Sequence, residues 1–356
     1  MKILFLFPYP SGTAASQRFR FEQYLDFLRE EGIQVDLQAF IDEKTWRILY
    51  KPGHYLPKIL GIIRGFLRRI KMLFRLGSYD FVFVHREASP LGPPVFEWLI
   101  ARVLKKKLIF DFDDAIWLPN TTDSNALVAR LKFHQKTAWI SRYAHKVSVG
   151  NAYLGEYAAK VNPRGVVLNP TTIDTEHLHN RLRDQSKVEK TVIGWTGTHS
   201  TLKYLDDILP VLQELEARYA FDFLVISNRH PEFQLRSLVF KPWNKATEMD
   251  DLLLMHIGLM PLSDDIWAKG KCGFKALQYM ALGIPALVSP VGVNTEIVED
   301  GIQGFVCKDA SDWKKAIIRL IEQPELRQTM GLRARQKIVD TYSVQSNRDN
   351  FRALFE

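Results

Sequence analysis

The sequence predicts an α/β protein with two Rossmann-like domains, each a doubly wound parallel sheet with helices on both faces. Short apolar runs alternate with amphipathic helical stretches along the chain, which is the pattern of βαβ units. The chain opens with such a unit, because a buried strand at residues 3–7 precedes a helix at 16–31, a stop at Gly32 and a strand at 34–40. The length of 356 residues, of which 46% are hydrophobic, suffices for two domain cores.

The charge balance and the cysteine content narrow the class of partner and the compartment. The net charge of +8 favours an anionic partner such as a nucleotide or a membrane surface. No nucleic-acid recognition motif is present, so we expect no nucleic-acid partner. The two cysteines, Cys272 and Cys307, lack metal-ligand spacing, which favours a reducing compartment. The apolar start at residues 1–8 is too short for a signal sequence, and no run of about 18 apolar residues predicts a spanning helix. We therefore expect a cytoplasmic protein.

The segment at residues 269–304 carries the most specific pattern, KGKCGFKALQYMALGIPALVSPVGVNTEIVEDGIQG. Apolar residues at helical spacing predict a helix that begins directly after Gly273. The main-chain amides of Gly273, Phe274 and Lys275 are then expected at the helix N-terminus, next to the ammonium groups of Lys271 and Lys275. Because several N–H donors and two cations converge, this pattern predicts an anion site that fits a pyrophosphate better than a carboxylate.

The run KCGFKALQYMALGIPALVSPVGVNTEIVEDGIQGFV resembles the donor-binding segment of the family 4 glycosyltransferases. The resemblance implies the GT-B fold, in which two Rossmann-like domains face a central cleft. It also implies sugar transfer from a UDP-sugar or GDP-sugar with retained anomeric configuration, with no metal or other cofactor required. Many members have two glutamates eight positions apart, where this chain has Gly270 and Gln278. The resemblance implies that Gln278 binds the ribose. Glu296, in the first turn of a helix that Asn294 is expected to cap, is assigned to the same donor site.

Two other strand ends of the second domain are candidates for donor binding. The loop expected after a strand at 191–194 contains Gly197, and a glycine-rich turn lets the backbone approach phosphate or sugar. The resemblance implies an arginine in this loop, but Trp195 stands in its place, so we expect the two lysines before and after Gly273 to neutralise the diphosphate.

The second of these strand ends, at residues 239–243, is where family members bind the base and the ribose. It places Lys241 and Trp243 among the candidates. The Trp243 ring either stacks on a base or fills the core.

In the first domain, polar residues follow two expected strands. Gly12 lies in the loop after the first strand, and Arg18 lies just past it. The resemblance implies that this loop approaches donor and acceptor, and the alternative for Arg18 is a solvated helix face. Asp113 and Asp114 follow a strand expected at 108–110, where the resemblance implies contact with the acceptor or the donor sugar, as hydrogen-bond acceptors or as a base. A helix cap by Asp114 is the alternative. A metal-binding Asp-x-Asp motif belongs to a different transferase fold, so we expect no metal.

Residues 58–76 predict a basic amphipathic helix. Arg64, Arg68, Lys71 and Arg75 are expected on one face, and the opposite stripe is apolar, with Ile59, Ile63, Phe66, Ile70 and Leu73. Such a helix either lies in an anionic membrane interface or packs its apolar stripe on its own sheet.

These patterns together predict the domain organisation and the function. We expect an N-terminal domain at 1–174, a linker at 175–190, a nucleotide-sugar-binding domain at 191–342, and a C-terminal helix at 343–356 that crosses back to the first domain. Further helices are expected at 127–143, 204–219 and 311–323, the last capped by Ser311.

The predicted function is retaining transfer of a sugar to a glycan or lipid-linked acceptor, in cell-surface polysaccharide or lipopolysaccharide synthesis, at the inner face of the cell membrane. A nucleotide-sugar epimerase of the same fold and a noncatalytic partner subunit of a transferase are the alternatives.

Overall fold

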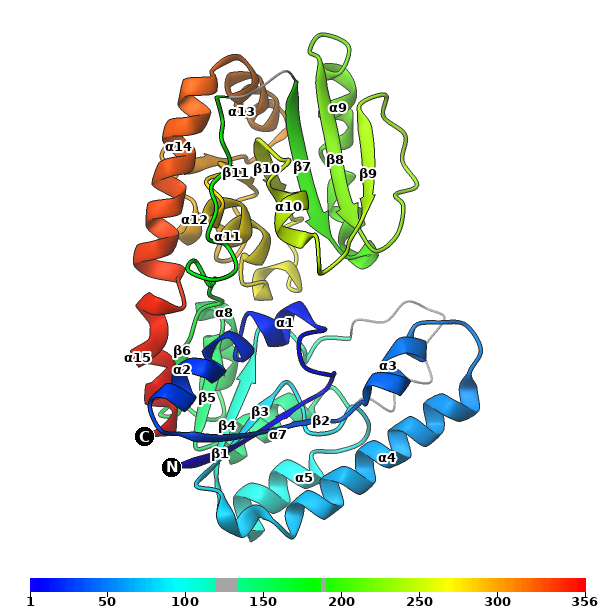
Figure 1. The fold of residues 1–356 in the computed structure, drawn as a ribbon, viewed down its shortest axis with the longest axis vertical. Coiled ribbons are helices and arrows are strands. Elements are labelled where there is room, and N and C mark those ends of the chain that lie inside the picture. The colour runs from blue at the N-terminus through cyan, green and yellow to red at the C-terminus, as the bar shows by residue number, and fades with distance from the viewer. Residues whose placement is uncertain (120–132, 187–189) are drawn as a thin grey trace. The chain divides into compact units, whose positions relative to one another are not determined.

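The computed structural model describes residues 1–119, 133–186 and 190–356 (Figure 1). The chain divides into two compact units. The first contains Met1–Thr171 and Arg348–Glu356, and the second contains Thr172–Asn347. Each unit holds one six-stranded parallel sheet, which confirms the predicted α/β fold class. The part of the expected helix at 127–143 that precedes residue 133, and the part of the expected linker at 187–189, lie outside the described residues.

The sheet of the first unit has the strand order β2-β1-β3-β4-β5-β6, with every described pair parallel. Its strands are β1 (Lys2–Phe7), β2 (Gln34–Ala39), β3 (Phe81–His85), β4 (Lys107–Phe112), β5 (Lys146–Val149) and β6 (Val166–Leu168). The helices of this unit are α1 (Ala15–Arg18), α2 (Leu25–Glu30), α3 (Glu43–Leu49), α4 (Tyr55–Leu73), α5 (Val95–Trp98), α7 (Lys136–Tyr143), α8 (Ala152–Ala159) and α15 (Arg348–Arg352).

The C-terminal segment completes the core of the first unit. Phe5 of β1 packs 4.8 Å from the ring of Phe83 on β3, and the ring of Phe355 lies 6.0 Å from Phe5. Phe351 of α15 stacks on Tyr24 at 4.2 Å. These aromatic contacts, all inside one unit, hold the end of the chain against the first sheet.

The sheet of the second unit has the order β12-β11-β10-β7-β8-β9. Its strands are β7 (Thr191–Gly197), β8 (Phe221–Ser227), β9 (Leu238–Pro242), β10 (Ile257–Met260), β11 (Ala286–Val288) and β12 (Gly304–Val306). Its helices are α9 (Leu209–Leu215), α10 (Glu248–Leu252), α11 (Phe274–Ala281), α12 (Asn294–Ile297), α13 (Ala310–Glu322) and α14 (Pro324–Lys337). Figure 1 shows α14 running along one side of this unit as its longest helix.

The expected helix at 16–31 is wrong as a single element. The chain forms the short helix α1, a 3-10 turn at Glu22–Tyr24, and α2. The break follows from tertiary contacts, because Gln17 donates to the Tyr9 carbonyl oxygen at 3.0 Å and Arg20 is drawn into a buried ion pair with Asp111. These long-range partners outweigh local helix propensity.

Several element boundaries in the second unit also differ from expectation. β7 continues to Gly197, so the expected glycine-rich turn there is wrong, and the expected helix at 204–219 is replaced by a 3-10 segment at His199–Leu205 followed by α9. Asn294 does not cap α12, because Val293 holds that position and the Asn294 amide donates to the Ser289 carbonyl oxygen.

The expected cap of α13 differs as well. Asp309, not Ser311, caps α13, because its carboxylate accepts from the Asp312 amide at 3.0 Å. The described part of the expected linker belongs to the second unit, where Gln185 donates to the His256 carbonyl oxygen at 3.1 Å.

Helix α4 packs against the rest of the first unit through two glycines. A Cβ on Gly61 would stand 2.2 Å from Oγ1 of Thr45, and a Cβ on Gly65 would stand 2.6 Å from the Phe40 ring, so only glycine permits this approach. On the same buried face, Arg69 donates to the carbonyl oxygens of Ala88 and Phe7 at 2.8 and 3.2 Å. These bonds tie α4 to the carboxyl end of β1 and to the loop after β3. Among the described helices, none combines the length and the apolar character needed to cross a membrane.

Candidate active site

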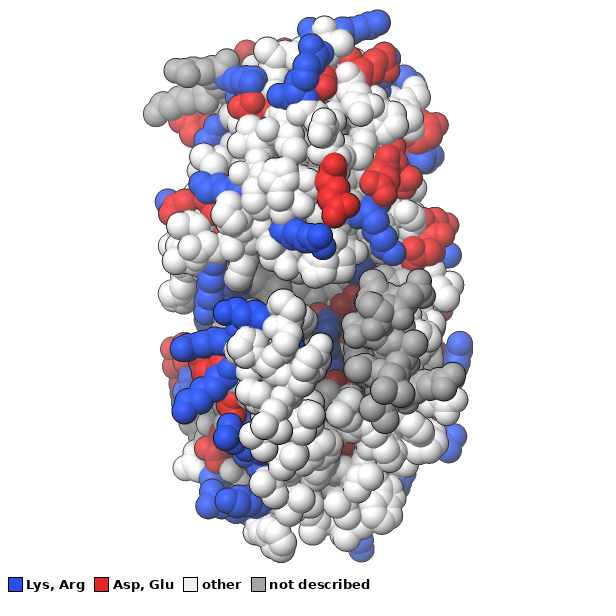
Figure 2. Space-filling model, turned by 90° about the vertical axis from the view of Figure 1, so that its right-hand side faces the viewer, with Lys and Arg blue, Asp and Glu red and all other residues white. Residues whose placement is uncertain are grey.

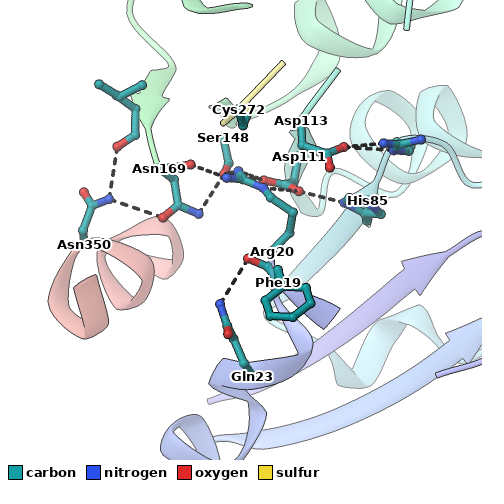
Figure 3. Close-up of polar contacts among 12 residues, drawn as sticks. Phe19, Arg20, Gln23, His85, Asp111, Asp113, Ser148, Asn169, Cys272 and Asn350 are labelled. Atoms are coloured by element: carbon teal, nitrogen blue, oxygen red, sulfur yellow. Dashed lines mark hydrogen bonds and ion pairs between the residues drawn. The ribbon is translucent and has the colours of Figure 1, made fainter. Parts of the chain in front are cut away.

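A buried network of charged and polar groups lies at the carboxyl ends of β3, β4 and β5 (Figure 3). Asp111, the second-last residue of β4, pairs with the Arg20 guanidinium, and neither side chain is exposed. Ser148 of β5 donates to Oδ1 of Asp111 at 2.6 Å, and Nδ1 of His85 lies 2.8 Å from Oδ2. Burial alone would raise the pKa of Asp111, but Arg20 and His85 outweigh it and hold the pKa well below its usual value. Asp111 is therefore an ionised acceptor, so Nδ1 of His85 donates to it.

The same network reaches the C-terminal segment. Arg20 also donates to the carbonyl oxygen of Asn169, just after β6, and the Asn169 amide donates to Oγ of Ser148 at 3.2 Å. Asn350 of α15 donates to the Leu168 carbonyl oxygen at 3.1 Å (Figure 3). Arg20 therefore fixes three strand ends of the first unit at the edge where parallel sheets bind ligands.

Asp113 and Asp114 lie beyond the end of β4 and share one arginine. Arg86 donates to Oδ1 of Asp113 at 2.7 and 3.0 Å and to Oδ2 of Asp114 at 2.9 Å. Burial raises the pKa of Asp113, but the charges of Arg86, His85 and Arg20 together lower it below the usual value. Asp113 is thus ionised at neutral pH and offers carboxylate oxygens to hydroxyl groups. Within the described ranges, no three His, Cys, Asp or Glu side chains cluster closely enough to hold a metal ion.

Gly12 and Arg18 are both engaged inside the first unit. Gly12 has a φ of +74°, and its amide donates to the Glu22 carboxylate at 2.8 Å. The Arg18 side chain is buried, with its guanidinium 5.0 Å from the Phe19 ring centre, so the alternative of a solvated helix face is wrong.

In the second unit, Gly273 is the position on which the start of α11 depends. Its φ is +68°, and a Cβ there would stand 2.0 Å from Cδ1 of Ile297, so the turn requires glycine. Lys275 places its ammonium group 5.5 Å from the Trp195 ring centre, and Lys271 places its own 5.7 Å from the Trp267 ring centre. The residues around the α11 N-terminus therefore include two lysines held beside aromatic rings, and Phe274 is the first residue of this helix.

The side chain of Gln278 is buried one turn into α11. It is 2% exposed, and its Nε2 atom has no hydrogen-bond partner among the residues that the structure describes. The next residue, Tyr279, anchors the helix to the sheet, because its hydroxyl accepts from the Thr196 amide at 3.0 Å and donates to the Leu259 carbonyl oxygen at 3.3 Å. Glu296 is exposed on α12.

Gly197 is not the loop residue that the sequence indicates. It ends β7, and a Cβ there would stand 2.6 Å from the Trp195 ring, which is 1% exposed in the core. The glycine therefore makes room for Trp195 at the end of a strand, and its part in donor binding stays a prediction.

Lys241 and Trp243 lie at the end of β9 beside a surface hollow of about 580 Å³, which Asn244, Lys245 and Thr247 also line. Lys241 pairs with Asp251 at 2.7 Å, and Nε1 of Trp243 donates to Glu248 at 3.3 Å. The Trp243 ring is 38% exposed, so the alternative that it fills the core is wrong.

The buried partners of Asp111 are what sequence reasoning missed. His85 and Asp111 were recognisable as polar residues at strand ends, and Arg20 lies in the segment after α1. Nothing in the spacing pairs Arg20 with Asp111, 91 positions away. The usable signal is that a charged residue at the end of an apolar strand needs a buried partner of opposite charge.

Comparison with known proteins gives a family for part of the chain. Residues 234–337 match the family described as Glycosyl transferases group 1. N-acetyl-alpha-D-glucosaminyl L-malate synthase from Bacillus anthracis is 28% identical over 120 residues, which are 33% of this chain and 29% of that protein. The match thus spans less than a third of the length of this relative.

The fold is shared with solved glycosyltransferases over nearly the whole chain. Sucrose-phosphate synthase from Thermosynechococcus elongatus superposes with a TM-score of 0.72 at 13% identity, over 100% of this chain and 98% of that one. HepE of Anabaena, solved with UDP and glucose, superposes with a TM-score of 0.62 at 13% identity, over 99% and 98% of the two chains. The chain has the GT-B fold, and the residues that match glycosyl transferases group 1 lie in its second unit.

Proposed function

We propose that the protein is a retaining glycosyltransferase of the family 4 type, which moves a sugar from a nucleoside diphosphate sugar to a glycan or lipid-linked acceptor. The observation that carries the proposal is the start of α11. A glycine with a left-handed backbone opens a helix of eight residues, and two lysines lie within two positions of it. Helix N-terminal amides and ammonium groups stabilise the charge that develops on a leaving diphosphate.

The donor is proposed to be a UDP-sugar or a GDP-sugar. The hollow at the end of β9 offers an exposed indole, Trp243, next to the lysines at 241 and 245, which suits a flat base linked to phosphate. HepE, which shares the fold, was solved with UDP and glucose, and this supports a nucleotide of that kind. Gln278 is proposed to bond the ribose hydroxyls through its amide, and Glu296 is retained as a candidate from the sequence alone.

Asp113 and Asp114 are proposed to contact the acceptor or the donor sugar. An ionised Asp113, held by Arg86, accepts hydrogen bonds from hydroxyl groups of the acceptor or of the donor sugar. In the same proposal no metal is required, because Lys271 and Lys275 supply the positive charge that a cation would otherwise bring. Turnover that persists in the presence of a chelator is the expected result.

The place of action is proposed to be the inner face of the cell membrane, in synthesis of a cell-surface polysaccharide or lipopolysaccharide. This proposal rests on a lipid-linked acceptor. The contact with the membrane itself depends on a different observation, the outer face of α4.

A two-part experiment tests the proposed reaction. Thermal unfolding is first measured with UDP, GDP and several of their sugars, and the donor that stabilises the protein is then incubated with and without a glycan acceptor. We expect stabilisation by one nucleotide class, because a ligand that binds only the folded state raises its stability, and release of nucleoside diphosphate that increases with acceptor. Conversion of the sugar without acceptor would indicate an epimerase, and the absence of any nucleotide effect would indicate a noncatalytic subunit.

A further inference from the structure

The outer face of α4 is apolar, although the helix is already packed against its unit. Large residues on this face of α4, together with Phe74 directly after the helix, point away from the protein and are between 46% and 87% exposed. This outer face consists of Leu56, Ile59, Ile63, Leu67, Ile70 and Phe74. A helix on the surface of a water-soluble protein normally buries its apolar stripe and exposes polar residues. Here the alternative that the apolar stripe packs on its own sheet is wrong for Ile59, Ile63 and Ile70.

The inward face explains why the stripe cannot turn toward the protein. Gly61 and Gly65 approach Thr45 and Phe40 too closely for any side chain, and Arg69 bonds three groups at the strand ends. Rotating the helix would break these bonds and bring large side chains into spaces that fit only glycine. The apolar stripe is therefore a fixed outward surface. Figure 2 shows mainly uncharged side chains over the end of the first unit where α3 meets α4.

The charges beside the stripe are all of one sign. Residues 44–79 contain nine Lys and Arg and no Asp or Glu. Arg64, Lys71 and Arg75 are exposed, and the helical period of about 3.6 residues places them in a row along one edge of the outer face. Arg68 departs from the expected basic face, because it turns inward and bonds the Phe40 carbonyl oxygen.

We infer that the outer face of α4 docks flat on an anionic lipid surface, with the apolar stripe in the interface and the row of Arg64, Lys71 and Arg75 at the headgroups. A helix of 19 residues with an apolar face and a basic edge has the form of an in-plane membrane anchor. A second copy of this chain is the less suitable occupant, since two identical basic edges would repel each other in a symmetric contact. Docking needs no donor sugar, so a measurement of membrane binding tests it independently of the transfer reaction.

The test measures co-sedimentation of the full chain with vesicles of phosphatidylcholine alone and of phosphatidylcholine mixed with phosphatidylglycerol. We expect binding to the mixed vesicles and much less to the neutral ones. Leu67→Gln should weaken binding roughly tenfold, because it removes one inserted side chain. Leu332→Gln is the matched control, since this leucine is 53% exposed on α14 and Leu67 is 51% exposed. Arg64→Gln with Lys71→Gln should weaken binding to the mixed vesicles roughly tenfold as well.

Three results would overturn the inference. One is equal binding by the Leu67 and Leu332 variants, and another is equal binding of the native chain to both kinds of vesicle. The third is a dimer in sedimentation velocity that Leu67→Gln dissociates, which would assign the face to a second copy. Thermal unfolding of each variant checks that the fold is retained, as expected for exposed positions.

Discussion

Arg86 binds Asp113 through two nitrogens, with Nε and one terminal nitrogen of the guanidinium 3.0 and 2.7 Å from the same carboxylate oxygen, Oδ1. The backbone of Arg86 is left-handed, with a φ of +61°. The pair keeps Asp113 ionised in a largely buried position. An acidic group held in this way is suited to receive a hydroxyl group of a sugar.

The first prediction concerns the pH dependence of turnover. Removing the arginine in Arg86→Gln should raise the pKa of Asp113, since burial then acts with less opposing positive charge. The acidic limb of the pH profile of kcat/KM should move to higher pH. Asp113→Asn should lower turnover about a hundredfold and remove that limb. An unchanged profile in both variants would show that Asp113 has no part in the reaction.

The second prediction concerns stability. Asp111→Asn should lower the free energy of unfolding by about 3–5 kcal/mol, because it leaves the buried Arg20 without its counter-charge. Asp26→Asn is the control. It breaks an exposed pair with Arg29 and should cost less than about 1 kcal/mol. Urea unfolding of the native chain, Asp111→Asn and Asp26→Asn at neutral pH measures the loss of unfolding free energy in each variant.

The same pair sets a pH dependence of stability. Because the pKa of Asp111 is lower in the folded state, its contribution is present above about pH 3.9 and is lost as pH falls through the lower folded value. The difference between the native chain and Asp111→Asn should therefore shrink in strong acid. Equal losses from Asp111→Asn and Asp26→Asn at neutral pH would contradict the structural role of the pair.

The third prediction separates a ligand role from a packing role for Gln278. Gln278→Met keeps the side-chain volume and removes a buried amide nitrogen that has no partner in the described part of the chain. An unsatisfied buried polar group costs about 1–3 kcal/mol, so the variant should be at least as stable as the native chain. Its affinity for UDP or GDP in isothermal titration should nevertheless fall. Lower stability with unchanged affinity would make Gln278 a structural residue.

The fourth prediction isolates the geometry at the start of α11. Gly273→Ala should be destabilised by the left-handed backbone, about 1–2 kcal/mol, and further by contact with Cδ1 of Ile297. Gly301→Ala is the control, because Gly301 has a φ of +77° and a Cβ added there would meet nothing within 4 Å, so it shows the backbone cost alone. Adding Ile297→Val to Gly273→Ala should recover part of the loss. Equal destabilisation of the two single variants in urea would show that the close approach has no cost.

The strands of both sheets could be predicted because buried parallel strands are short apolar runs. Such runs can be recognised from the local sequence alone. β1 at Lys2–Phe7, for example, covers the strand expected at residues 3–7. Trp195 shows the limit of local pattern, since β7 continues as far as Gly197, the glycine that suggested a turn, and places the indole in the core.

The parts of the site that depend on distant partners were not predictable. The helix expected at 16–31 breaks because Arg20 reaches a carboxylate on β4, and no local pattern contains that contact. In contrast, the glycine before α11 and the two lysines beside it belong to one short segment, so the start of this helix could be inferred from sequence. The exposed stripe of α4 is an intermediate case, because the helical spacing was visible but the face that packs inward was decided by Gly61 and Gly65.

The most direct test of the proposed donor site is isothermal titration of UDP and GDP into the native chain and into the double variant Lys271→Ala, Lys275→Ala. Lys308→Ala with Lys315→Ala, two exposed lysines of the same unit, controls for the loss of charge. We predict that the native chain and the control bind one of these nucleotides with similar affinity, and that the double variant binds it about tenfold or more weakly with an unchanged unfolding midpoint. Equal affinity in all three proteins would contradict the assignment of the α11 N-terminus as the diphosphate site.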